Sequence, residues 1–190
     1  MKKIMLSVIL VALTYGSVAQ PVVGNFTLMN VADGKMVSLD GYPECIALAV
    51  VFTSNECAFD RSYTDRLRAL MEMYQGKIQF LLVNSFIEPV EAIDKMAIIH
   101  SQRNLPAPYL ADKEQTALEC LGARKSPEVF LIRNENRKLS LVYSGSIDDN
   151  PQVSKDVRAN YLKDAIDRLL KGEKGPFENQ RAVGCTIRKK

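Results

Sequence analysis

The stretch from Ala47 to Tyr74 constrains the fold most, because a strand pattern and a helix pattern meet there at one cysteine. Ala47–Phe52 is a continuous apolar run, which is typical of a buried strand. A short polar turn, residues 53–56, leads to Cys57. Apolar residues then recur at helical spacing, and they are Phe59, Tyr63, Leu67, Leu70, Met71 and Tyr74. The sequence predicts a buried strand that feeds an amphipathic helix, with Cys57 at the joint.

Cys57 is the first candidate for a reactive residue. The N–H groups at the start of a helix lack partners, and the helix dipole is positive there, so both favour the thiolate form of a cysteine. Glu56 and Asp60 act against this effect, because they place negative charge close to the sulfur. Arg61 or another cation would have to offset that charge.

The first nineteen residues have the pattern of a secretory signal peptide. Lys2 and Lys3 precede an apolar run, Ile4–Leu13, which is too short to span a membrane. Small residues in the segment Gly16–Ala19 then supply a cleavage site. We therefore expect cleavage after Ala19, export of the rest of the chain to the periplasm, and no membrane span after cleavage.

The net charge gives no support to nucleic-acid binding, and the cysteine content allows disulfide bonds. Without Lys2 and Lys3 the formal charge falls from +3 to +1, because 23 basic residues then face 22 acidic ones. A nearly neutral chain gives no electrostatic reason to bind nucleic acid. The chain has four cysteines, Cys45, Cys57, Cys120 and Cys185. In an oxidising compartment they allow three complete pairings, which sequence alone does not distinguish.

The remaining patterns predict an α/β domain over residues 20–175, in which a central mixed sheet has helices on both faces. An extended lead-in covers residues 20–44, and a polar tail, residues 176–190, carries Cys185. Further expected strands are Ile78–Val83, Glu128–Ile132 and Leu139–Tyr143, and further expected helices begin at Glu88, at Asp112 and at about Val153, the last of them ending at Leu170.

His100 is the only histidine of the chain. Together with Ile93, Met96 and Ala97 it forms one stripe of an expected helix, which favours a packed residue over a catalytic base. With a single histidine, the chain has no material for a histidine-based triad or a multi-histidine metal site. We expect neither a metal nor another cofactor.

Two motifs together resemble the thioredoxin fold. Phe52 stands five residues before Cys57, and Gly122–Pro127 precedes a strand about seventy residues later. More closely, the chain resembles the redoxin branch, which is related to the alkyl hydroperoxide reductase/thiol-specific antioxidant proteins and to exported thioredoxin-like proteins. The matching segments are Gly24–Leu28, Asp33–Lys35, Pro108–Asp112, Ser126–Leu131, Gly145–Asp149 and Gly184–Ile187.

This resemblance implies a thiol-dependent oxidoreductase in which Cys57 attacks a protein disulfide or a peroxide. It also implies that Pro127 is in cis and faces Cys57, and that Ser126, Ser54 and Asn55 line the place where substrate binds. An external thiol would supply the electrons.

The chain also departs from the family patterns. Asp60 stands where a dithiol thioredoxin has its second cysteine, and Val51 stands where those proteins bury an acid. Glu56 replaces the tryptophan before the cysteine. Ser54 matches the hydroxyl residue of the peroxiredoxin signature, but Val50 occupies the position of its proline. One active-site thiol is therefore expected, and a partner thiol must come from elsewhere.

Cys185 is the first candidate for that partner, because a tail can fold back over the domain. Cys120 is the second, and Cys45 is too far along the strand to reach Cys57. Outside such a role, Cys45 and Cys120 are expected to be small buried hydrophobic residues. Cys185 or an external thiol would then resolve the oxidised Cys57.

Two functional hypotheses follow. The first is an exported oxidoreductase that uses Cys57. The second is a binding or structural module that has kept the fold and lost turnover, with a structural Cys57–Cys185 bridge. A thiol metal-carrier site ranks below both, because no second ligand lies close to Cys57 in the sequence.

Overall fold

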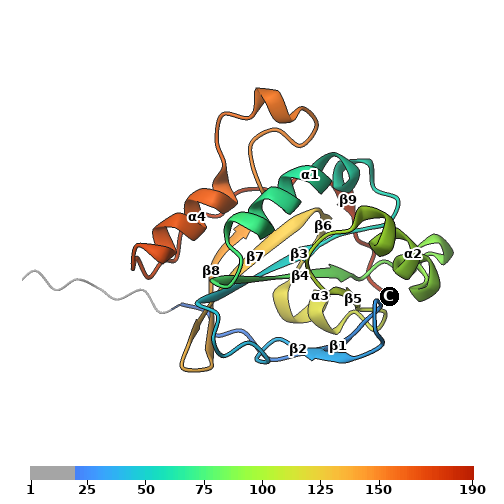
Figure 1. Ribbon diagram of the computed structural model, residues 1–190, viewed down its shortest axis with the longest axis horizontal. Helices are drawn as coiled ribbons and strands as arrows, with labels where there is room; N and C mark the ends of the chain where they lie inside the picture. Colours follow the sequence, from blue (N-terminus) through green and yellow to red (C-terminus); the bar gives the residue numbers. More distant parts are fainter. Residues whose placement is uncertain (1–19) are drawn as a thin grey trace, which may run out of the picture.

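The computed structural model describes residues 20–190, and Figure 1 shows its arrangement. The predicted signal peptide lies outside the described residues. Within them, no helix is both long enough and apolar enough to cross a membrane.

A seven-stranded mixed sheet forms the centre of the molecule. Its strands lie in the order β2 (Met36–Ser38), β1 (Thr27–Asn30), β5 (Tyr109–Ala111), β4 (Ile78–Asn84), β3 (Ala47–Phe52), β7 (Glu128–Glu135) and β8 (Lys138–Gly145). β3 runs parallel to β4 and antiparallel to β7. The predicted strands are confirmed, and β5 is an additional one.

The middle strand β3 is buried along its whole length, as its continuous apolar run predicts. Its side chains alternate between two hydrophobic clusters, one on each face of the sheet. Ala47, Ala49 and Val51 belong to the first cluster, and Leu48, Val50 and Phe52 to the second.

Helices cover both faces of the sheet (Figure 1), which confirms the predicted architecture. α1 (Ala58–Met73), α2 (Ile93–Arg103) and α4 (Tyr161–Leu170) contribute buried residues to the first cluster, and α3 (Thr116–Leu121) contributes to the second. Two short 3-10 turns, Pro89–Glu91 and Ser154–Asp156, precede α2 and α4.

The last helix begins later than the sequence predicts, at Tyr161 rather than near Val153. Side-chain oxygens hold the preceding residues in a loop. The Asn150 carbonyl accepts the backbone N–H of Val153 at 2.8 Å, and the Asp149 carboxylate accepts that of Arg158 at 2.9 Å. Such local bonds compete with helix formation, which explains the difference.

The C-terminal tail packs against the domain. β9 (Cys185–Thr186) pairs antiparallel with β6 (Lys125–Ser126), so that Ser126 lies opposite Cys185. The Ile187 side chain packs into the second hydrophobic cluster. The sequence does not predict either short strand, because two residues are too few to show the alternation of apolar and polar residues that is typical of a strand.

Candidate redox site

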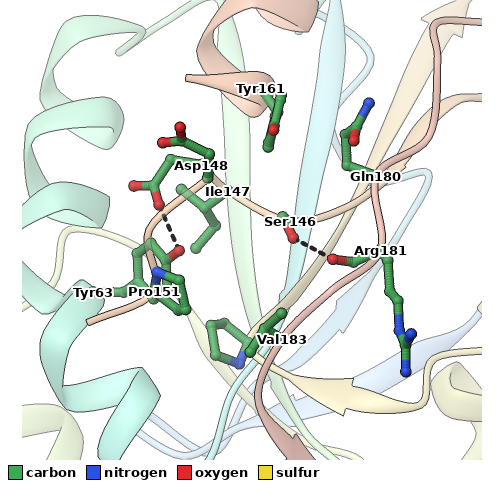
Figure 2. Close-up of a pocket in the computed structure, with 11 residues that line it drawn as sticks. Tyr63, Ser146, Ile147, Asp148, Pro151, Tyr161, Gln180, Arg181 and Val183 are labelled. Carbon is green, nitrogen blue, oxygen red and sulfur yellow. Dashed lines mark hydrogen bonds between the residues drawn. The ribbon is translucent and has the colours of Figure 1, made fainter. Parts of the chain in front are cut away.

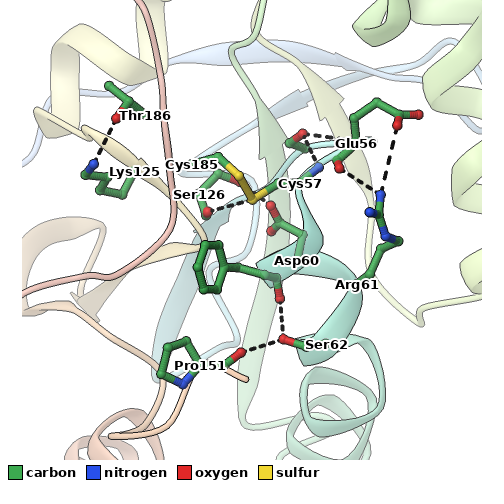
Figure 3. The surroundings of a disulfide bond; sticks show 12 residues. Glu56, Cys57, Asp60, Arg61, Ser62, Lys125, Ser126, Pro151, Cys185 and Thr186 are labelled. Atoms are coloured by element: carbon green, nitrogen blue, oxygen red, sulfur yellow. Dashed lines mark hydrogen bonds and ion pairs between the residues drawn. A yellow bond between two sulfur atoms is a disulfide. The ribbon is translucent and has the colours of Figure 1, made fainter. Parts of the chain in front are cut away.

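Cys57 and Cys185 form a disulfide across the N-terminal end of α1 (Figure 3). Their Cα atoms are 6.0 Å apart, although 128 positions separate them in the sequence. Cys57 is the N-cap residue of α1, as the strand–helix joint predicts. Its side chain is buried, with 4% exposed, whereas Cys185 is partly exposed. Cys185 is therefore the sulfur that an external thiol can reach in the disulfide state.

The proline loop lies against this disulfide. The Ser126–Pro127 peptide bond is cis, and the Ser126 carbonyl oxygen lies 3.3 Å from the Cys57 sulfur. In the disulfide that sulfur has no proton to donate, whereas a reduced Cys57 thiol can donate a hydrogen bond to the same oxygen. Pro127 and Ser126 therefore lie beside Cys57, where the resemblance implies them.

The turn before Cys57 is held by a buried carboxylate that sequence reasoning missed. The Glu91 carboxylate accepts the Ser54 hydroxyl at 2.6 Å, the Asn55 backbone N–H at 2.8 Å and the Asn84 amide at 2.7 Å. The Ser54 hydroxyl oxygen in turn accepts the backbone N–H of Cys57 at 3.1 Å. Glu91 follows a proline on a short turn, and nothing in its sequence context marks it as buried.

The two polar residues predicted to bind substrate, Ser54 and Asn55, are both buried in this state. The Asn55 side chain donates to the Val90 carbonyl and accepts the Tyr109 hydroxyl. Arg103 reaches across from α2 and donates to the carbonyls of Ser54 and Asn55, at 2.9 Å each. In the disulfide state both residues therefore shape the turn that carries Cys57.

The charge near Cys57 differs from the sequence-based expectation. Glu56 is exposed, and Arg61 donates to its backbone carbonyl at 2.7 Å, so solvent and a cation both moderate its effect. Asp60 is instead buried, with 3% exposed, and its carboxylate accepts the Ser126 hydroxyl at 2.5 Å. The other carboxylate oxygen, Oδ1, has no hydrogen-bond partner within the described residues.

The burial of Asp60 raises its pKa to about 7, although the Ser126 hydroxyl, Thr53 and the charge of Arg103 act in the opposite direction. The sequence carried one signal for this burial. Asp60 precedes Tyr63, Leu67 and Met71 by three, seven and eleven residues, which is the spacing of the buried face of α1. Phe59, expected on that face, is only partly buried.

The tail is fitted closely to the proline loop at Gly184. A Cβ at Gly184 would lie 2.1 Å from the Ser126 carbonyl oxygen, so only glycine allows this approach. The Ile187 backbone N–H donates to the Arg124 carbonyl at 3.0 Å. The Arg124 side chain itself is exposed. The tail thus occupies the backbone edge beside Pro127.

A cavity of about 190 Å³ lies next to this edge (Figure 2). Pro127 and the tail residue Val183 contribute to its wall, together with Tyr63 and Asp148. The Tyr63 hydroxyl donates to the Asp148 carboxylate at 2.7 Å, and this bond joins α1 to the loop after β8.

The other two cysteines correct a prediction. Cys45 is only partly buried and Cys120 is exposed, so neither is the buried hydrophobic residue that was expected. α3 turns Ala117 and Leu118 inward, which leaves position 120 on its outer side. Both thiols are free. His100 is half-buried and packs against Tyr109, with 5.9 Å between the ring centres, and burial lowers its pKa.

Among residues 20–190, no group of three or more His, Cys, Asp or Glu side chains is arranged to hold a metal ion.

No known family model and no curated protein matches the chain. Solved structures are similar to it over most of its length. An uncharacterised conserved protein from Geobacillus kaustophilus is 27% identical, with a TM-score of 0.81 over 90% of this chain and 92% of that chain. A hypothetical protein from Sinorhizobium meliloti 1021 is 28% identical, with a TM-score of 0.79 over 90% and 95% of the two chains.

More distant matches show the fold. The exposed lipoprotein thioredoxin of Streptococcus pneumoniae is 20% identical, with a TM-score of 0.59 over 79% of this chain and 100% of that chain. Thiol-disulfide oxidoreductases from Bacteroides species and a peroxidoxin from Mycobacterium tuberculosis also match. The predicted thioredoxin-like fold, of the kind that redoxins share, is confirmed.

Proposed function

We propose that this protein is a thiol-disulfide oxidoreductase whose redox pair is Cys57 and Cys185. One observation carries the proposal, namely a disulfide that joins a helix N-cap cysteine to a tail cysteine directly beside the Ser126 carbonyl oxygen. The start of α1 stabilises a Cys57 thiolate, which makes Cys57 both a good nucleophile and a good leaving group.

The proposed cycle moves two electrons from an external thiol reductant to a substrate disulfide. The Cys57 thiolate attacks one substrate sulfur, the substrate S–S bond breaks, and the other substrate sulfur leaves as a thiolate. The Cys185 thiolate then attacks the Cys57 sulfur, which forms the Cys57–Cys185 disulfide and releases the second substrate sulfur. A reduced external dithiol restores the two thiols.

The tail must move for this cycle to run, because Cys57 is buried in the disulfide state. Once the disulfide is reduced, β9 is held to β6 by backbone pairing and by the burial of Ile187 rather than by a covalent bond. Release of β9 exposes the β6 edge, to which an extended protein segment can add as a strand. Ser126, Ser54 and Asn55 would then lie at the rim of the substrate site.

We propose a protein disulfide as the substrate, because the edge beside Cys57 already accepts an extended chain, the tail itself. A peroxide is the second candidate and would oxidise the Cys57 thiolate to a sulfenic acid, which Cys185 resolves as the disulfide with loss of water. In the oxidising compartment expected after export, the external reductant has to restore the dithiol after each encounter. N-terminal sequencing of the exported protein tests the export itself, with Gln20 expected first.

Insulin reduction in the presence of dithiothreitol tests the function directly. We expect the wild type to accelerate insulin reduction and Cys57→Ser to show only the uncatalysed rate, because it has no thiol at the helix start. Cys120→Ser is the matched control, since Cys120 is a free, exposed thiol and should leave the rate unchanged. The same three proteins are compared for peroxide consumption.

The alternative is a structural bridge in a module that has lost turnover, and the close fit of Gly184 against Ser126 favours it. A redox titration in glutathione buffers separates the two functions. A Cys57–Cys185 bridge that is reduced reversibly in the folded protein supports the oxidoreductase. A bridge that is reduced only when the domain unfolds would contradict it.

A further inference from the structure

The tail segment Gly184–Ile187 binds to the domain in the way that an extended peptide ligand would. Its strand β9 pairs antiparallel with β6, and Ser126 lies opposite Cys185. Figure 3 shows the tail beside β6, with the disulfide crossing from Cys185 to Cys57 at the start of α1. A mixed disulfide between Cys57 and a strand-forming substrate would contain the same bond. The bound tail is therefore a structural template for a substrate segment.

The position before the tail cysteine has room only for glycine. A Cβ at Gly184 would lie within 3.0 Å of three backbone atoms, which are the carbonyl oxygen and carbon of Ser126 and the nitrogen of Pro127. Backbone atoms of a loop cannot turn aside as the end of a flexible side chain can. A strand with a larger residue at this position has to move away from β6, which costs pairing and packing.

The position two residues after the cysteine takes an apolar side chain. Successive side chains of a strand point to opposite faces, so Ile187 lies on the same side as Cys185. Ile187 is buried in the second hydrophobic cluster, with 6% exposed, and Cys185 packs against that cluster. The Ile187 backbone N–H also donates to the Arg124 carbonyl at 3.0 Å. When the tail leaves, the place of Ile187 is open to another aliphatic side chain.

The position directly after the cysteine is less selective. The Thr186 side chain is exposed, and its hydroxyl oxygen accepts a hydrogen bond from the Lys125 ammonium group at 2.8 Å. Exposed contacts at the rim of a binding site contribute little to affinity. Many side chains therefore fit at this position.

We infer that the β6 edge selects substrate disulfides in which one cysteine lies in a Gly-Cys-X-aliphatic segment, where X is any residue. The inference rests on the proposed function for its biological use. The substrate cysteine takes the place of Cys185, the glycine before it takes that of Gly184, and the aliphatic residue takes that of Ile187. The C-terminal tail is then a built-in competitor of the substrate.

Strands and disulfides are exchanged together in this scheme. The Cys57 thiolate attacks the sulfur of the substrate cysteine, the substrate S–S bond breaks, and the other substrate sulfur leaves as a thiolate. When the tail returns to β6, the Cys185 thiolate attacks the Cys57 sulfur, and the first substrate sulfur leaves as a thiolate as well. The reduced substrate thus loses its covalent bond and its place on β6 to the same segment, which favours its release.

The test follows the reaction of Cys57 with short peptides in the Cys185→Ser protein. Each peptide carries its cysteine as a thiopyridyl mixed disulfide, and attack by the Cys57 thiolate releases thiopyridone, which is measured by its absorbance. The reference peptide, Val-Gly-Cys-Thr-Ile-Arg, has the sequence of residues 183–188. Each rate is divided by the rate of the same peptide with dithiothreitol, which removes differences in intrinsic reactivity. A protein that also carries Cys57→Ser gives the background from Cys45 and Cys120.

We expect the reference peptide to react about tenfold faster than a peptide with alanine in place of glycine, because the added methyl group meets the loop backbone. Alanine in place of isoleucine should also slow the reaction about tenfold, since the apolar site is then left unfilled. Serine in place of threonine, at the exposed position, is the matched control and should keep the reference rate. Equal corrected rates for all four peptides would overturn the inference.

Competition between the tail and the peptide gives a second measurement. Ile187→Ala, added to the Cys185→Ser protein, weakens the binding of the tail to β6, so the reference peptide should react several-fold faster. Lys189→Ala, at an exposed tail position, is the control and should leave the rate unchanged. No acceleration by Ile187→Ala would mean that peptide and tail bind in different places, which contradicts the inference.

Should the Cys185→Ser protein fail to fold, the wild type is tested with the symmetric disulfides of the same four peptides as substrates and dithiothreitol as reductant. The reference disulfide should have a kcat/KM about tenfold above that of the two alanine peptides, and equal values would contradict the inference. Failure to reduce insulin would contradict only the proposed function, because the single reaction of Cys57 with a peptide needs no turnover. Equal peptide rates together with insulin reduction would contradict only the inferred selectivity.

Discussion

Buried carboxylates organise the polar interior near the disulfide, and each is held in a different way. Glu91 is surrounded by donors, from Ser54, Asn55 and Asn84, and therefore resembles a fixed anion that orders a turn. Asp60 accepts the Ser126 hydroxyl at Oδ2, and its Oδ1 has no hydrogen-bond partner among residues 20–190. The two buried carboxylates therefore differ in how many donors hold them.

Replacement of Glu91 should loosen the turn that carries Cys57. Glu91→Gln puts an amide N–H₂ where a carboxylate oxygen now accepts bonds, so at least one buried donor loses its acceptor. We expect a loss of about 2–3 kcal/mol in the free energy of unfolding, measured by urea denaturation. Glu72→Gln, on the exposed side of α1, is the control and should change little. A Glu91 variant as stable as the control would show that the turn is held by other bonds.

Asp60 should make the stability of the protein depend on pH in a definite direction. The raised pKa means that the folded protein keeps this proton up to about pH 7, whereas the unfolded chain loses it near pH 4. The free energy of unfolding therefore falls as the pH rises from about 4 to about 7, and it levels off above that range.

Asp60→Asn should remove this dependence. The variant should gain stability relative to the wild type as the pH rises through that range, by up to about 4 kcal/mol at pH 8. Urea denaturation at pH 4, 6 and 8 measures the difference, with Asp94→Asn on the exposed side of α2 as the control. A constant difference at all three pH values would contradict the assignment of the buried charge.

At the level of elements, the tail strand β9 determines whether Cys57 is covered and bonded to Cys185. It covers Cys57, supplies Cys185 and pairs with the edge beside Pro127. The tail approaches the domain closely at two glycines. At Gly184 an added Cβ would meet the Ser126 carbonyl oxygen, and at Gly145 it would lie 1.6 Å from the carbonyl oxygen of the tail residue Gln180. The tail is therefore part of the fold, although its sequence looks like a polar terminus.

Gly184→Ala should weaken the pairing of β9 with β6, because the added Cβ would clash with the Ser126 carbonyl oxygen and push the tail outward. We expect dithiothreitol to reduce the Cys57–Cys185 bridge at least several-fold faster in this variant, with the domain still folded. Lys189→Ala, at an exposed tail position, is the matched control. Unchanged reduction kinetics in Gly184→Ala would mean that the tail does not limit access to the disulfide.

The elements themselves follow from the sequence to different degrees. The strand Ala47–Phe52 and the helix after Cys57 were predictable, because a long apolar run and a sustained helical period are strong local signals. The start of α4 was not, since bonds from Asp149 and Asn150 replace the expected first turns. β6 and β9 exist only because they pair with each other across the fold.

For the whole molecule, the disulfide closes a loop of 128 residues, so it restricts the unfolded chain strongly. On chain-entropy grounds its loss should cost about 4–5 kcal/mol in the free energy of unfolding. The Cys57→Ser, Cys185→Ser double variant should still fold, because both hydrophobic clusters and the sheet lie largely outside the tail. Urea denaturation against the oxidised wild type measures the loss, and a variant that fails to fold would favour the structural bridge.

The sequence by itself determined a strand–cysteine–helix joint, an α/β sheet with two apolar faces and a proline loop of thioredoxin type. These are local patterns, which the chain carries within stretches of about ten to thirty residues. Only the tertiary structure decided that Cys185 pairs with Cys57 and that Asp60 lies buried against Ser126. Those contacts join residues 66 and 128 positions apart, and the pairing of β3 with β7 and of β9 with β6 brings them together.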